Sequence, residues 1–82
     1  MLTTGNQLKA ARALAGVEQL ALAEAAGVSI GTVRNMEACG GDTLKSGLKT
    51  ITAVQRALEA AGVEFIPANG SGPGVRMRRQ DG

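Results

Sequence analysis

The sequence predicts a mainly α-helical domain of four helices, followed by a short C-terminal β-hairpin or by strands that pair between two copies. Through the first 62 residues, apolar side chains recur every three or four positions, which is the period of a helix buried on one face. Hydrophobic residues make up 44% of the 82 positions but only one is aromatic, and small aliphatic side chains favour packed helices over a β-sandwich. Beyond Gly62, short β-prone segments surround a glycine-rich stretch.

The first helix is expected between Thr4 and Gly16, with Met1 and Leu2 trailing or packed loosely before it. Thr4 and Gln7 have the spacing of a capping box, in which the Thr4 hydroxyl caps the helix and Gln7 reaches back to the Thr4 amide. Gly16 can adopt the left-handed conformation that ends a helix. The expected inner stripe consists of Leu8, Ala11 and either Leu14 or Ala15.

A tight turn is expected to join a second helix, residues 18–26, to a third helix, residues 29–38. Gly27 favours a left-handed helix end, and Ser29 can cap the next helix through its hydroxyl. Glu18 suits the helix dipole but is a weaker N-cap than serine or threonine. In the third helix the inward positions are Val33 and Met36, and the leading and outward positions are Ser29, Ile30, Gly31, Arg34 and Asn35.

A fourth helix is expected to begin within residues 47–50 and to end at Ala61, where Gly62 stops it. Residues 1–62 would then form one helical domain, since a chain of this length can bury only one modest core. The expected inner stripe of the fourth helix consists of Leu48, Ile51, Val54 and Leu58.

The C-terminal residues 63–82 are interpreted as a β extension of this domain. Val63–Ile66 and Val75–Arg78 have the character of strands, the glycine-rich residues 69–74 between them form a turn or loop, and residues 79–82 are expected to be a frayed tail. An isolated two-stranded hairpin is marginal in water. The strands must therefore lean on the helices or pair with another copy.

The composition excludes several classes of site. There is no histidine and only one cysteine, Cys39, so a disulfide within the chain is impossible and a tetrahedral zinc site lacks its ligands. Glu37 has no second carboxylate, histidine or nucleophile at a useful spacing, so we expect neither an enzyme nor a cofactor. No stretch resembles a membrane span or a signal peptide, which predicts a cytoplasmic protein. The net charge of +2 permits nucleic-acid binding.

One group of residues stands at the mutual spacing of a known family. The group comprises Arg12, Gln19, Leu22-Ala23, Gly27-Val28-Ser29, Val33, Met36 and Glu37. On these residues, the stretch from Leu8 to about Leu58 resembles the lambda-repressor/Cro-type helix-turn-helix family, also called the xenobiotic-response-element type. Residues 60–66 and 72–76 look like a subgroup of very short bacterial regulators.

The resemblance implies that the third helix enters the DNA major groove. It implies that Gln19 touches a backbone phosphate and supports the reading helix, and that Arg12 and Glu37 form a buried ion pair. Positions matching base-contacting residues are Ser29, Ile30, Gly31, Arg34 and Asn35. The chain departs from the family at Glu18, where serine or threonine is usual, and at Ile30 and Gly31, which replace polar readers.

The residues themselves are chemically suited to this role. Arg34 can make a bidentate pair with guanine and Asn35 with adenine, whereas an ordinary solvated face is the alternative for both. Ile30 can press on a thymine methyl group or belong to the core. The residues that could reach phosphates are Gln19, Thr32, Thr43, Lys45 and Lys49, although solubility alone would also explain the lysines.

These features predict a homodimeric, sequence-specific transcriptional regulator of bacterial type. It would act as a repressor and autoregulator on an inverted-repeat operator, with RNA polymerase or another regulator as a further contact. The residues expected to support dimerisation are Phe65, Ile66, Val75 and Met77. The alternative is a protein-interaction module, such as an antitoxin or anti-activator, because Leu20, Ala21 and Ile30 offer apolar surface and the basic charge is small.

Overall fold

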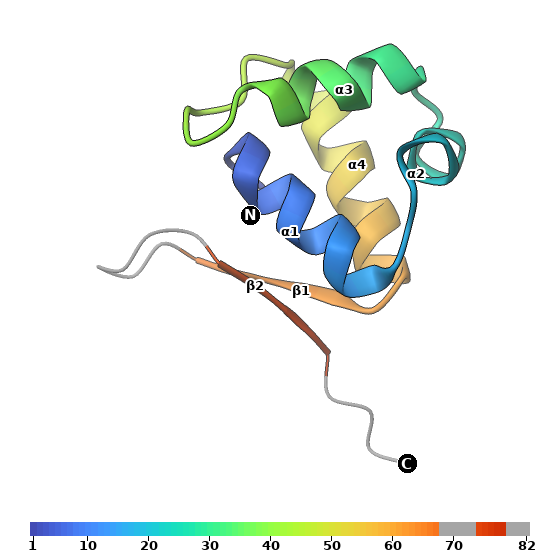
Figure 1. Cartoon of the computed structure of the whole chain (residues 1–82), viewed down its shortest axis with the longest axis vertical. Coiled ribbons are helices and arrows are strands. Elements are labelled where there is room, and N and C mark those ends of the chain that lie inside the picture. Colours follow the sequence, from blue (N-terminus) through green and yellow to red (C-terminus); the bar gives the residue numbers. More distant parts are fainter. Residues whose placement is uncertain (68–73, 79–82) are drawn as a thin grey trace.

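The computed structural model describes residues 1–67 and 74–78 of the chain, and it confirms the mainly helical fold with a C-terminal hairpin (Figure 1). Among these residues, no helix combines the length and the apolar character needed to cross a membrane. Residues 69–73 of the predicted loop and the predicted tail at 79–82 lie outside the described residues. The elements are α1 (Gly5–Ala15), α2 (Gln19–Ala26), α3 (Ile30–Ala38), α4 (Leu48–Ala60), β1 (Val63–Ile66) and β2 (Gly74–Met77).

The helix boundaries follow from local capping chemistry. The Thr4 hydroxyl accepts a hydrogen bond from the Gln7 amide at 3.1 Å, as the capping box predicts. The Gln7 side chain, however, accepts from the amide of Thr3 at 2.6 Å and not from that of Thr4. A β-bridge pairs Thr4 with Thr43, and the chain is extended where it enters the helix.

The turn between α2 and α3 forms as the sequence predicts. Gly27 ends α2 with φ of 71°, in the left-handed region that only glycine adopts without cost. The Ser29 hydroxyl then accepts from the Thr32 amide at 3.1 Å and caps α3. Glu18 makes no side-chain cap bond at the start of α2, which agrees with its being a weak cap.

Two expectations about the core were wrong. Leu2 is only 2% exposed, because its amide donates to the Gln55 side chain and the neighbouring Thr3 carbonyl accepts from Leu44, which ties the N-terminus down. Leu48 is 66% exposed, since it is the first residue of α4 and stands one turn beyond the core. The buried apolar residues are Leu2, Leu8, Ala11, Leu22, Ala23, Val33, Met36, Leu44, Val54, Leu58 and Val63.

The hairpin belongs to the same core as the helices. β1 and β2 pair antiparallel with Val63 opposite Met77 and Phe65 opposite Val75. Val63 is fully buried, and Phe65 and Val75 pack against the core from the same face of the hairpin. Figure 1 shows α1 lying between α3 on one side and the hairpin on the other, and α1 contacts both. The face of α3 that points away from α1 is therefore remote from the strands.

At Gly5 the backbone of α1 approaches that of α3 too closely to leave room for a side chain. A methyl group at this position would lie 2.6 Å from the carbonyl oxygen of Met36 and 2.7 Å from that of Glu37. Gly5→Ala is therefore expected to lower the free energy of unfolding by about 1–3 kcal/mol, since the backbone must move apart. Gly31→Ala in α3, where the added methyl meets nothing closer than 3.7 Å, should raise it by about 0.5–1 kcal/mol. Urea denaturation measures both, and a Gly5→Ala protein as stable as the parent would contradict this packing.

Candidate nucleic-acid interface

The face of α3 that points away from α1 gathers most of the residues predicted to meet DNA. Ser29, Gly31, Arg34 and Asn35 are exposed there, while Val33 and Met36 on the opposite side are fully buried. Ile30 and Thr32 are half-buried, and Ile30 packs against the core, so part of its surface is already used. The result is a short, capped helix that is fixed along one side and open along the other.

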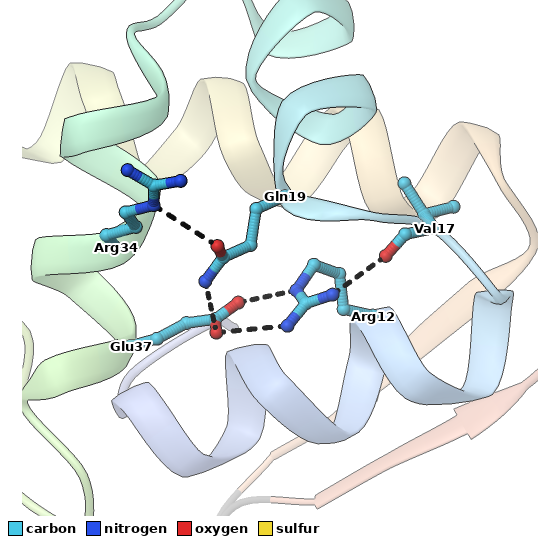
Figure 2. Close-up of polar contacts among 5 residues, drawn as sticks. All are labelled: Arg12, Val17, Gln19, Arg34 and Glu37. Atoms are coloured by element: carbon cyan, nitrogen blue, oxygen red, sulfur yellow. Dashed lines mark hydrogen bonds and ion pairs between the residues drawn. The ribbon is translucent and has the colours of Figure 1, made fainter.

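An ion pair joins α1 to the end of α3, as the resemblance implies. Arg12 Nε donates to Glu37 Oε2 at 2.6 Å and Arg12 Nη2 donates to Glu37 Oε1 at 3.1 Å (Figure 2). A third donor, Arg12 Nη1, reaches the Val17 carbonyl at 3.1 Å. The Glu37 side chain is 5% exposed and that of Arg12 is 23% exposed. Bidentate geometry and an additional backbone acceptor are the conditions under which a buried pair tolerates its loss of hydration.

Gln19 connects this ion pair to the exposed Arg34 on α3. Its Nε2 donates to Glu37 Oε1 at 3.1 Å, and its Oε1 accepts from Arg34 Nε at 3.4 Å (Figure 2). Both ends of the Gln19 amide are therefore used within the protein, although the resemblance implies a phosphate contact for this residue. The sequence alone gives no signal of the inner bond, because that bond depends on where the fold places Gln19 relative to the buried Glu37 carboxylate.

The protonation of the pair is fixed by these contacts. Burial alone would raise the pKa of Glu37, but hydrogen bonds from Arg12 and Gln19, together with the positive charges of Arg12 and Lys9, outweigh it. The pKa of Glu37 therefore lies below its ordinary value. The hydrogen bond to Glu37 raises the pKa of Arg12, against the opposing effect of its burial. Both groups remain charged at neutral pH.

Two shallow depressions border the outward face of α3. The first has a volume of about 440 Å³, and its lining comprises Arg12, Glu18, Gln19, Leu20, Ile30 and Arg34. The second has a volume of about 320 Å³, and its lining comprises Asn35, Ala38, Cys39, Asp42 and Lys45. Each depression combines basic and acidic side chains, so the surface beside α3 is not uniformly positive.

The three other residues predicted to contact phosphates, Thr43, Lys45 and Lys49, lie outside α3. Lys45 lies beside Asn35 in the second depression. Thr43 is exposed, and its backbone is held by the bridge to Thr4. Lys49 is exposed in the first turn of α4, and no described contact joins its side chain to α3.

The residues predicted to support dimerisation fall into two groups. Phe65 and Val75 pack against the core of their own chain, so the hairpin does not need a second copy to bury them. Ile66 pairs with Gly74 and lies on the opposite face of the hairpin from Phe65, where it is half-buried. Met77 is 41% exposed. A role of these residues between chains stays a prediction.

No protein-family model matches the chain, and a comparison with curated proteins finds no relative. Within residues 1–67 and 74–78, no group of three or more histidine, cysteine, aspartate or glutamate side chains could hold a metal ion. The function is therefore inferred from the residues of the chain and from their geometry.

Glu37→Ala is expected to lower the free energy of unfolding by about 3 kcal/mol, the lower end for a broken buried pair, because Arg12 keeps some access to water. Glu64→Ala is the matched control, since Glu64 pairs with Arg76 at the surface with side chains 41% and 66% exposed. An exposed pair is worth less than about 1 kcal/mol. Chemical denaturation measures the free energy of unfolding of both variants. Equal decreases would show that the pair of Arg12 and Glu37 contributes no more to stability than the exposed pair of Arg76 and Glu64.

Stability should fall in acid because of Glu37. Since the folded pKa is lowered, this contribution is present above the ordinary glutamate pKa of 4.5 and is lost as the pH falls through the folded value. Below about pH 4.5, the midpoint of thermal unfolding should drop more steeply for the parent than for Glu37→Gln. Identical slopes for the parent and Glu37→Gln would rule out Glu37 as the source.

Proposed function

We propose that this chain is a sequence-specific double-stranded DNA-binding transcriptional regulator that inserts α3 into the major groove. The observation that carries the proposal is the outward face of α3. Arg34 and Asn35 stand exposed on it while the other face is locked into the core. A major groove about 12 Å wide admits one α-helix, and arginine and asparagine are the side chains that pair bidentately with guanine and adenine.

The surroundings of α3 support this orientation. At its leading end Ser29 has a small side chain and Gly31 has none, which permits close approach of the helix backbone to base edges. Lys45 and Thr43 follow the C-terminal end of α3, where they could meet the phosphates on the far side of the groove. Gln19 faces inward to Glu37, so it contributes less to phosphate binding than its position alone suggests.

The hairpin supports the proposal of a homodimer. Arg78 N donates to the Gly62 carbonyl, so the backbone of Arg78 points toward β1. Backbone groups alternate in direction along an antiparallel strand, so those of Val75 and Met77 point to the outer edge of β2, away from β1. A second copy added along this edge would be related by a twofold axis perpendicular to the sheet. Because α3 and the hairpin lie on opposite sides of α1 (Figure 1), this axis leaves both α3 helices facing the same way.

Such a dimer suits an inverted-repeat operator, whose half-sites are about 34–36 Å apart from centre to centre. A small domain seated on an operator represses by excluding RNA polymerase from the promoter, and control of its own gene is the simplest use. The dimer and the repressor role are parts of the proposal, as is a further contact with the polymerase or another regulator.

A second candidate function is a protein-interaction module that keeps the same fold. It is favoured by Leu20, which is 55% exposed beside Ile30 in the depression next to α3. Glu18 in the same depression would repel a phosphate. Salt separates the two candidates, because contacts with DNA phosphates weaken steeply with added salt whereas apolar contacts between proteins do not.

The test is an in vitro selection of bound duplexes at moderate salt, followed by titration of the selected site. The proposal predicts an inverted repeat with half-sites about 10–10.5 base pairs apart and an affinity that falls steeply as salt rises. Arg34→Ala should lose roughly 1–3 kcal/mol of preference at one base of each half-site. Its matched control is Arg56→Ala, which removes the same charge from the exposed surface of α4.

Three results would count against the proposal. Selection without enrichment would contradict sequence-specific binding, and a single half-site would contradict the dimer. A selected site that Arg34→Ala and Arg56→Ala bind with the same base preference as the parent would reject Arg34 as a reader.

A further inference from the structure

Four side chains form an unbroken series from the half-buried surface of α1 to the open face of α3. Arg12 holds Glu37, Glu37 accepts from Gln19 at 3.1 Å, and Gln19 accepts from Arg34 at 3.4 Å (Figure 2). The series begins at a pair that is mostly hidden from water and ends at an exposed arginine. It therefore offers a physical path by which the interior constrains a surface side chain.

The charge of Glu37 dictates which way the Gln19 amide faces. An ionised carboxylate accepts hydrogen bonds and donates none, so the amino group of Gln19 must turn toward Glu37. The carbonyl oxygen of Gln19 then faces the opposite way. An arginine has only donors to offer, and the carbonyl end is the one that Arg34 can use. Gln19 thus presents at the surface an acceptor whose direction is set by a buried charge.

We propose that Gln19 is a positioning residue that orients the Arg34 guanidinium for base recognition; this inference rests on the proposed DNA-binding function. Gln19 holds Arg34 through Nε, and the two terminal nitrogens lie beyond this bond at the end of the side chain (Figure 2). They make no hydrogen bond with any residue of 1–67 or 74–78. Their two parallel N–H groups match O6 and N7 of guanine, and a long side chain that is already held loses less conformational freedom on binding.

This role differs measurably from a phosphate contact. A residue that binds phosphate strengthens binding to every duplex alike, so its loss weakens binding to all duplexes by the same factor. A residue that acts only through Arg34 changes the preference for one base and leaves the affinity for unrelated duplexes unchanged. Its effect must also vanish when Arg34 itself has been removed.

The experiment compares Gln19→Met, Arg34→Ala and the double variant on the selected duplex and on the same duplex with the Arg34-dependent base replaced. The control is Gln55→Met, because Gln55 also bonds through both ends of its amide, to the Leu2 amide and to Glu59, but lies on α4. Gln19→Met is expected to lower the ratio of the two affinities at least about fivefold, within the roughly 5- to 150-fold that a bidentate pair supplies. In the Arg34→Ala background it should have no further effect, and Gln55→Met should keep the parental ratio.

A second readout does not need DNA. In the free protein, the NMR signal of the Arg34 Nε–H group should shift in Gln19→Met and stay in place in Gln55→Met. Equal weakening of all duplexes by Gln19→Met, including in the Arg34→Ala background, would overturn the inference in favour of a phosphate contact. If the parent shows no base preference, the proposed function fails, and an unchanged Arg34 signal in Gln19→Met would overturn the positioning role separately.

Discussion

The ion pair between Arg12 and Glu37 is the constraint on which the geometry of the candidate site depends. It joins α1 to the last turn of α3 across the core, with Glu37 almost fully buried. Breaking a buried pair by removing one partner is costly because it leaves the other charge stranded. Replacing both partners by apolar residues is often neutral, since the desolvation cost disappears with the attraction. The main effect of the pair is therefore to align α3 with α1, and its net contribution to the free energy of unfolding is smaller.

The close approach at Gly5 serves the same alignment. A side chain there would collide with the backbone of Met36 and Glu37. The amide of Asn6 also donates to the carbonyl of Gly40 at 2.8 Å, just past the end of α3. The C-terminal end of α3 is thus fixed to α1 by backbone contacts and by the ion pair, while Ser29 caps its N-terminal end. A helix fixed along its buried face and at its C-terminal end presents its open face without rearrangement.

The sequence predicted the parts of this arrangement that local chemistry decides. Gly27 and Ser29 fixed the turn between α2 and α3, because a left-handed helix end and an N-cap each require only one residue. The burial of Leu2 could not be predicted, since it depends on Gln55 and Leu44, which are far away in the chain. The exposure of Leu48 was missed because helical period gives the face of a residue but not whether its turn reaches the core.

Long-range polar contacts were equally hidden from the sequence. The pairing of Arg12 with Glu37 was implied by resemblance alone, and nothing in the order of residues indicated that Gln19 would turn toward Arg34. The strands were predicted, yet their apolar residues could bury themselves within one chain or between two. The structure shows that Phe65 and Val75 pack against their own core, which leaves the outer edge of β2 as the candidate contact with a second copy.

The double variant Arg12→Met/Glu37→Met tests the central claim most directly, by its free energy of unfolding and by its base preference on the selected duplex. We expect it to be more stable than Glu37→Ala, because no charge is left stranded. We also expect its preference at the Arg34-dependent base to be lost, because Gln19 no longer has a carboxylate to set its direction. A double variant that is less stable than Glu37→Ala, or that discriminates between bases as well as the parent, would contradict the account.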